Sequence, residues 1–156
     1  MYRDIERVLI DRERIASRVR ELGGQIASDL AGELDREGAI PDASGRIVLI
    51  PVLTGSIIFV ADLMRQMPLK ISLGVVAVSS YPGRATSSQG ATMEHDLPGD
   101  LEGKHVLVVD DILDSGRTMA LIRDRILAQK PASLRLCVLL DKDARRASEV
   151  KVDYAG

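Results

Sequence analysis

One stretch of the chain constrains the fold more than any other, because it joins a buried strand, a turn and a helix. Residues 105–109 form the run His-Val-Leu-Val-Val, whose lack of alternation predicts a strand buried on both faces. The turn Ser115–Thr118 follows, and apolar residues between Met119 and Leu127 then recur at helical spacing. A strand of this kind is typical of a parallel sheet that is covered by helices.

The turn after this strand combines a phosphate cradle with a group of acids. The free N–H groups and the dipole of a helix N-terminus attract anions, and Gly116 lets the backbone approach a ligand closely. The carboxylates of Asp110, Asp111 and Asp114 would repel a bare phosphate. They suit a ligand that also presents hydroxyls and Mg²⁺, such as a sugar phosphate with vicinal hydroxyls.

A second class of protein carries a similar strand. In response-regulator receivers, a Val- and Leu-rich strand near the start of the domain ends in paired acids that hold Mg²⁺. Such a domain of about 100 residues needs a later strand with a phosphorylatable Asp, whereas only 46 residues follow Asp110. The receiver and a purely structural turn are the alternatives to a phosphate-and-metal site.

The same order of strand, small-residue turn and helix occurs earlier, around the turn Leu53–Ser56. The apolar runs predict strands at 46–52, 69–78, 105–109 and 133–140, and helices at 57–67 and 117–129. These segments form two βαβ units, which require parallel strands. We therefore expect a single domain over residues 1–156 with an α/β fold, in which a central, mostly parallel sheet has helices on both faces.

The N-terminal part predicts one amphipathic helix with Asp11 as its N-cap. Its apolar stripe at steps of three and four residues consists of Ile15, Val19, Leu22, Ile26, Leu30 and Leu34. Gly23 and Gly24 weaken the middle of this helix by about 1 kcal/mol each. We expect it to cover the sheet and to carry no chemistry.

The stretch around the three acids resembles the 5-phosphoribosyl-1-pyrophosphate (PRPP) signature of the type I phosphoribosyltransferase family, in its hypoxanthine-guanine branch. That branch usually has Glu-Asp where this chain has Asp110-Asp111, and Asp114 matches its third acid. The turn Leu53–Ser56 is similar to the pyrophosphate-binding loop of the family, with Thr54 where the family has Lys. The resemblance covers nearly the whole chain.

This resemblance implies a purine-salvage enzyme that transfers the phosphoribosyl group from PRPP to hypoxanthine or guanine with Mg²⁺, giving IMP or GMP and pyrophosphate. It implies that Asp110 and Asp111 face the metal and the ribose hydroxyls, and that Asp114 is the catalytic acid/base at purine N7. The residues that it implies in substrate binding are Thr54, Gly55, Ser80, Tyr81, Asp110, Asp111, Asp114, Ser115, Gly116, Arg117, Thr118 and Lys142.

Three further segments bear on the resemblance. Residues 79–93 are rich in Ser, Thr and Gly, which indicates a flexible loop. This loop resembles the catalytic flap of the family, with Ser80-Tyr81 as the Ser-Tyr pair. A lid of this kind would keep a glycosyl cation from water. Lys142 matches a Lys that hydrogen-bonds the exocyclic oxygen of a 6-oxopurine. The family's hood, which supplies a base-stacking aromatic, would follow Gly156, so we expect a truncated or missing hood.

The composition of the chain limits the classes of partner that we expect it to bind. The formal net charge of −2 argues against a broad nucleic-acid surface, and the sequence has no signal peptide or apolar run of membrane length. We expect a cytoplasmic homo-oligomer, dimer or tetramer, without nucleic-acid or membrane partners. The alternatives are a phosphoribosyltransferase for xanthine, adenine or uracil, a PRPP-binding regulatory protein that binds RNA, and a non-catalytic relic.

Overall fold

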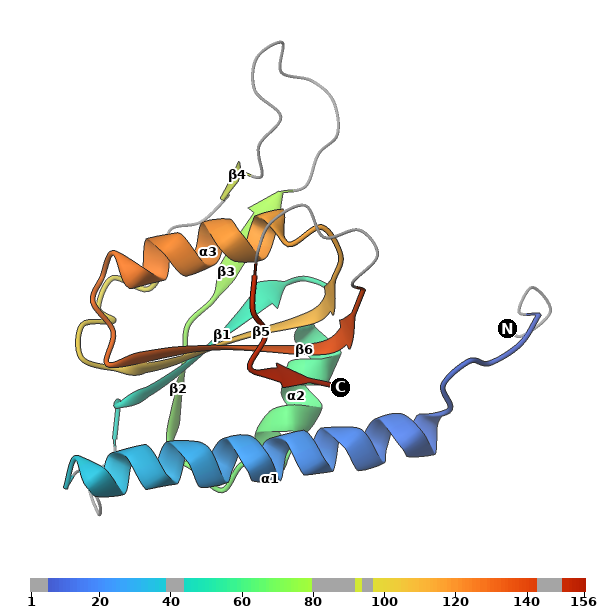
Figure 1. Cartoon of the computed structure of the whole chain (residues 1–156), viewed down its shortest axis with the longest axis horizontal. Helices are drawn as coiled ribbons and strands as arrows, with labels where there is room; N and C mark the ends of the chain where they lie inside the picture. The colour runs from blue at the N-terminus through green and yellow to red at the C-terminus, as the bar shows by residue number, and fades with distance from the viewer. Residues whose placement is uncertain (1–5, 39–43, 80–91, 94–96, 143–149) are drawn as a thin grey trace, which may run out of the picture.

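The protein folds around one central sheet, with a long helix running along one side of it (Figure 1). The computed structural model describes residues 6–38, 44–79, 92–93, 97–142 and 150–156. In chain order the elements are α1 (Arg12–Arg36), β1 (Ile47–Leu53), α2 (Ile57–Arg65), β2 (Ile71–Leu73), β3 (Val76–Ser79), β4 (Thr92–Met93), β5 (His105–Leu113), α3 (Arg117–Leu127), β6 (Ser133–Asp141) and β7 (Tyr154–Ala155).

The strands confirm the expected α/β architecture. Their order is β4-β3-β1-β5-β6-β7, and β2 pairs with β1 as well. Among the described strands, β3 and β4 form the one antiparallel pair, and all other pairs are parallel. Both expected βαβ units are present, as β1–α2–β3 and β5–α3–β6. Because β1, β5 and β6 are parallel, their carboxyl ends meet at one edge of the sheet.

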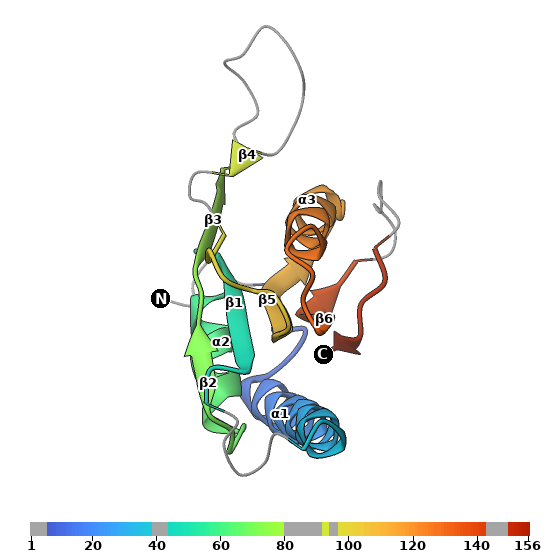
Figure 2. The same ribbon diagram turned by 90° about the vertical axis from the view of Figure 1, so that its left-hand side faces the viewer.

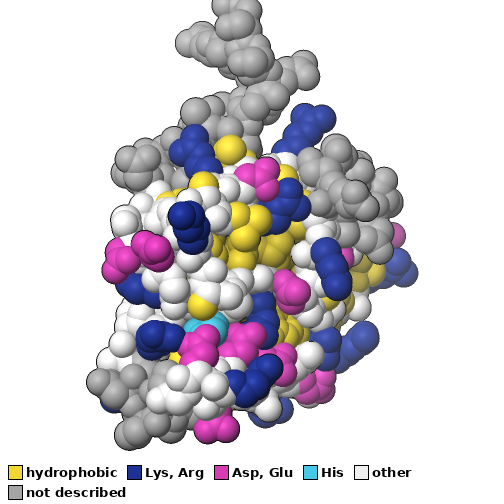
Figure 3. All heavy atoms as spheres, turned by 60° about the vertical axis from the view of Figure 1, so that its left-hand side comes forward, with side chains coloured by type: hydrophobic (Ala, Val, Ile, Leu, Met, Phe, Trp, Pro, Cys, Tyr) yellow, Lys and Arg dark blue, Asp and Glu magenta, His cyan; other side chains and the backbone are white. Residues whose placement is uncertain are grey.

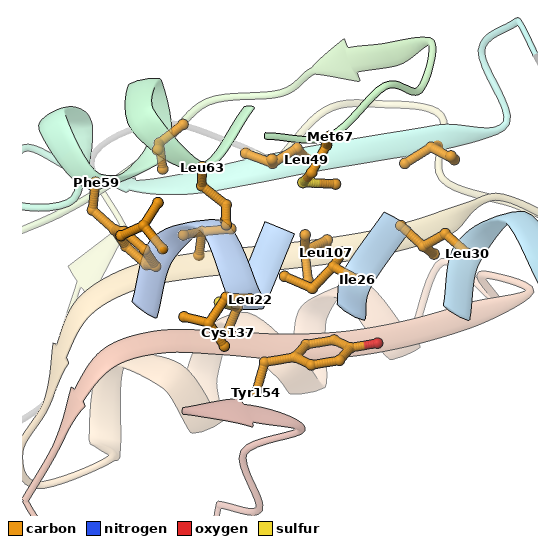
Figure 4. Close-up of a cluster of buried hydrophobic side chains, with 14 of the residues drawn as sticks. Leu22, Ile26, Leu30, Leu49, Phe59, Leu63, Met67, Leu107, Cys137 and Tyr154 are labelled. Carbon is orange, nitrogen blue, oxygen red and sulfur yellow. The ribbon is translucent and has the colours of Figure 1, made fainter. Parts of the chain in front are cut away.

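Helices cover both faces of the sheet, as Figure 2 shows: α1 and α2 lie on one face and α3 on the other. The strands are therefore buried on both sides, which is why their sequences are continuously apolar. Figure 4 shows the core on the α1 and α2 side. The residues labelled there are Leu22, Ile26, Leu30, Leu49, Phe59, Leu63, Met67, Leu107, Cys137 and Tyr154. A second core, beneath α3, includes Val106, Val108, Met119, Ile122, Ile126 and Val138.

The long helix α1 begins as the sequence predicts, because Oδ1 of Asp11 accepts a hydrogen bond of 2.8 Å from the N–H of Arg14. The predicted stripe is buried from Val19 to Leu34, whereas Ile15 is exposed. Gly23 has a packing role: a Cβ there would lie 2.4 Å from Cβ of Gln66, just beyond α2. No helix in the described part of the chain has both the length and the apolar character to cross a membrane.

A cluster of charged side chains fixes the C-terminal end of α1 to the start of the sheet. His105, the first residue of β5, is almost fully buried, and its Nδ1 lies 2.9 Å from Oγ of Ser133 and 3.0 Å from Oε2 of Glu33. Nη1 of Arg135 donates to the same Glu33 oxygen at 3.1 Å. Figure 3 shows acidic and basic side chains gathered around a histidine on this face. The cluster joins α1 to β5 and β6.

Three elements differ from the sequence prediction. β5 continues through the acids to Leu113, instead of ending before them. The strand expected at 69–78 is divided into β2 and β3 at Gly74, where a Cβ would lie 2.3 Å from Cγ of Pro98. The short strand β7 was not predicted, and it pairs with the middle of β6. The lid predicted at 79–93 lies almost wholly outside the described residues, apart from Ser79 and β4.

Candidate active site

A pocket of about 370 Å³ lies at the carboxyl edge of the sheet, between the ends of β1 and β5. This is where ligands bind in open parallel sheets, because the loops there leave a crevice. The described residues that line it are Val52, Leu53, Gly55, Asp110, Asp111, Ile112, Leu113, Asp114, Ser115, Gly116, Thr118 and Met119. This lining includes three carboxylates and no Lys or Arg, so the described wall is acidic.

The turn between β1 and α2 forms one wall of the pocket. Ser56 is fully buried, and its hydroxyl donates to the carbonyl oxygen of Val52 at 2.6 Å, which ties the turn to the end of β1. The peptide bond between Leu53 and Thr54 is cis. Gly55 lines the pocket, whereas Thr54 is exposed and does not.

The acid pair lines the pocket next to this turn, at the end of β5, and is held by its own backbone. Oδ1 of Asp110 accepts from the N–H of Asp111, and Oδ1 of Asp111 accepts from the N–H of Ile112, each at 2.9 Å. Burial, followed by the interaction with the Asp111 side chain, raises the pKa of Asp110 to about 7. Asp110 is therefore partly protonated at neutral pH, and a cation bound to its carboxylate would displace that proton.

The N-terminus of α3 closes the pocket. Gly116 is the N-cap residue, with φ of +77°, a conformation that residues with a Cβ rarely adopt. The N-cap residue makes no side-chain hydrogen bond, and Oγ of Ser115 accepts a long hydrogen bond of 3.5 Å from the N–H of Arg117. The other first-turn N–H groups can serve an anion, together with the hydroxyls of Ser115 and Thr118, which also line the pocket. Arg117 is exposed and is not part of the lining.

Asp114 lies between the acid pair and this helix. It lines the pocket, and its Oδ1 is buried without a hydrogen-bond partner among the described residues. A buried carboxylate oxygen without a donor costs free energy, and in a native protein such a group calls for an explanation, for example a catalytic role or a bound ion or water. A ligand that presents an N–H or O–H group to this oxygen would remove the cost.

The remaining predicted residues are placed as follows. Lys142 is exposed immediately after β6; its backbone N–H donates to the carbonyl of Leu113 at 2.9 Å, but it does not line the pocket. Ser80 and Tyr81 lie outside the described residues. Sequence reasoning missed the apolar part of the lining, which includes Ile112, a residue that is 36% exposed in spite of its apolar side chain.

The acid pair suits Mg²⁺ better than a metal held by protein ligands alone. No group of three or more His, Cys, Asp or Glu side chains that could hold a metal occurs in the described part of the chain. Mg²⁺ is commonly bound by one or two carboxylates together with waters and substrate phosphates. Asp110 and Asp111, side by side at the pocket wall, supply oxygen donors of that kind.

The comparisons with known proteins identify the family. Residues 16–156 match the profile of the phosphoribosyl transferase domain, and the chain belongs to this family of glycosyltransferases. It is 38% identical to the hypoxanthine phosphoribosyltransferase of Haemophilus influenzae over 96% of this chain and 78% of that protein. It is 40% identical to the hypoxanthine-guanine phosphoribosyltransferase of Mycobacterium avium over 98% of this chain and 72% of that protein.

Solved structures agree with the sequence comparisons. A crystal structure of a hypoxanthine phosphoribosyltransferase from Staphylococcus aureus superimposes with a TM-score of 0.82 at 31% identity, covering 100% of this chain and 78% of that one. The fold is therefore that of the type I phosphoribosyltransferases, as the sequence predicts.

Proposed function

We propose that the protein transfers the phosphoribosyl group of PRPP to N9 of hypoxanthine or guanine in purine salvage, with Mg²⁺. In this reaction the bond from ribose C1′ to pyrophosphate breaks, a bond from C1′ to N9 forms, and the purine loses one proton. The observation that supports the proposal most strongly is that an acid pair and a helix N-terminus, whose N-cap residue makes no side-chain hydrogen bond, open into one pocket. Such a pocket fits a ligand with both hydroxyls and phosphate.

Each wall of the pocket has a role in binding PRPP. The N–H groups at the start of α3, with Ser115 and Thr118, bind the 5′-phosphate, because they present donors and a favourable dipole. Asp110 and Asp111 accept hydrogen bonds from the ribose hydroxyls. The turn that contains Gly55 offers backbone N–H groups to the pyrophosphate.

The acidity of the pocket explains why the proposal includes a cation. The described lining has no Lys or Arg, and Thr54 replaces the Lys that is usual in the family, so pyrophosphate would meet little positive charge. Mg²⁺ bound beside Asp110 and Asp111 would supply that charge and neutralise the leaving group.

The base-side roles fall on three sites. Asp114 accepts the proton of purine N7 as N9 attacks, because its buried Oδ1 has no other partner among the described residues. Lys142, at the end of β6, hydrogen-bonds the exocyclic oxygen of the base, and Ser80-Tyr81 close over the sugar. We further propose that the enzyme works as a cytoplasmic homo-oligomer without nucleic-acid partners, which sedimentation and cell fractionation would test.

The experiment is a turnover assay of the purified protein with PRPP, Mg²⁺ and a panel of bases: hypoxanthine, guanine, xanthine, adenine and uracil. Formation of IMP or GMP with pyrophosphate supports the proposal, and turnover of another base alone changes the substrate. Asp111→Asn should weaken binding of Mg²⁺–PRPP in a calorimetric titration, whereas Glu102→Gln, at an exposed acid before β5, should not. RNA binding without turnover would contradict the proposal.

A further inference from the structure

Gly55, in the turn between β1 and α2, does not need to be glycine for its backbone conformation. Its φ lies outside the left-handed region, in contrast to that of Gly116 at +77°. Any residue with a Cβ could adopt this backbone. The restriction at this position is therefore one of space.

The space is taken by a functional carboxylate. A Cβ on Gly55 would lie 2.7 Å from Oδ2 of Asp111, closer than non-bonded carbon and oxygen atoms approach, and 3.0 Å from Oδ1, which is a tight contact. The three nearest heavy atoms to that Cβ all belong to the Asp111 carboxyl group. From its other side, the carboxylate is held by the N–H of Ile112 at 2.9 Å. It therefore lies wedged between the β1–α2 turn and the backbone of β5.

We infer that Gly55 is a positioning residue: the absence of its side chain sets where the Asp111 carboxylate lies, and so sets the geometry of the acid pair. This inference rests on the proposed function of Asp111 in binding Mg²⁺–PRPP. It assigns Gly55 a role besides any contact of its N–H with pyrophosphate. It also makes the turn after β1 and the acids of β5 one unit, although 56 positions separate the two residues in the sequence.

Alanine separates the two roles of Gly55. The substitution Gly55→Ala keeps the backbone N–H, so a pyrophosphate contact through that group survives. The added methyl group fills the space next to the Asp111 carboxylate. Because that carboxylate ends a short side chain with two rotatable bonds, it can turn away while the backbone of the turn stays in place. We therefore expect Gly55→Ala to fold and to present a displaced carboxylate.

The test compares four proteins: wild type, Gly55→Ala, Asp111→Ala and the double variant. The first measurement is the affinity for Mg²⁺–PRPP by calorimetry. Gly55→Ala should weaken it by about tenfold, as expected for coupled neighbours. Gly99→Ala is the matched control, because Gly99 is exposed, has no atom within 4 Å of an added Cβ, and should bind as wild type does. Unchanged affinity in Gly55→Ala would overturn the inference.

The second measurement is the melting temperature of the four ligand-free proteins. The cost of Ala at position 55 should disappear when Asp111 is already Ala, because the three heavy atoms nearest to the added Cβ all belong to that carboxyl group. If Gly55→Ala fails to fold, the double variant should fold again; a double variant that stays unfolded places the clash elsewhere and overturns the inference. Wild-type protein that does not bind Mg²⁺–PRPP would refute the proposed function instead, and this stability comparison would still decide the contact.

Discussion

Replacing Asp114 by Asn separates the contribution of one carboxylate to catalysis from its contribution to the stability of the fold. Oδ1 of Asp114 is buried and has no hydrogen-bond partner among the described residues. The residue is also not the cap of α3, because Gly116 occupies that position and the side chain that accepts from the N–H of Arg117 is that of Ser115. The substitution therefore removes a charge and preserves the shape, without removing a helix cap.

The expected magnitudes follow from this placement. General acid–base catalysis contributes about 10²–10⁴-fold, so kcat should fall by about 10²-fold, which corresponds to about 2.7 kcal/mol in the activation free energy. Loss of an N-cap would cost about 1 kcal/mol of stability. Since Asp114 is not the cap, the melting temperature should stay level or rise slightly. Affinity for PRPP should also stay near that of wild type.

The assay is steady-state turnover at saturating PRPP and hypoxanthine, with a melting curve for each protein. Asp124→Asn is the matched control, because it removes an exposed carboxylate from α3 that does not line the pocket, and it should leave kcat unchanged. An Asp114→Asn protein with undiminished kcat would remove this residue from the mechanism. A clear loss of melting temperature would show that the side chain serves the fold.

Two further predictions concern packing and protonation. Gly23→Ala and Gly24→Ala gain the same helix propensity of about 1 kcal/mol, but only the first places a Cβ 2.4 Å from Cβ of Gln66. Chemical denaturation should therefore show Gly23→Ala to be less stable than Gly24→Ala by about 1–3 kcal/mol. Equal stabilities of the two variants would contradict the packing role of Gly23. Because the pKa of Asp110 rises on folding from 3.8 to about 7, the folded protein holds a proton that the unfolded chain loses between these values. Metal-free protein should therefore lose stability as pH rises through this window, and Asp110→Asn should abolish the trend in melting temperature. An Asp110→Asn protein that keeps the wild-type slope would refute this assignment.

The strands and helices that have strong local patterns could be predicted from the sequence. The stripe of α1 and the apolar runs of β1, β5 and β6 follow from periodicity, because these elements bury their faces in a covered sheet. The position of the pocket also followed, since parallel strands bring their carboxyl ends to one edge. Asp110, Asp111 and Asp114 could therefore be placed beside the start of α3 before the structure was known.

Other features depend on tertiary contacts that no local pattern carries. β5 runs on through two acids, which have low strand propensity, because Asp110 pairs with Val138 and Ile112 with Leu140 of β6. The strand β7 has two residues and exists through its pairing with Cys137 and Val138. In the same way, Gly55 was identified from the sequence as part of a turn, but its contact with Asp111 appears only when β1 and β5 lie together.

The buried polar groups at the two ends of β5 have different surroundings, and this difference indicates which end of the strand binds a ligand. At its start, the buried His105 faces Ser133 and Glu33, so its Nδ1 finds a partner within the protein. Beyond its other end, the buried oxygen of Asp114 has no partner among the described residues. Both ends carry a buried polar atom without a hydrogen bond in the described part of the chain, Nε2 of His105 and Oδ1 of Asp114. Nε2 of His105 lies 3.2 Å from Oε1 of Glu37, however, whereas Asp114 lines the pocket. We therefore expect a ligand to complete the polar groups at the carboxyl end of this strand, and a bound substrate should stabilise the protein chiefly through that end.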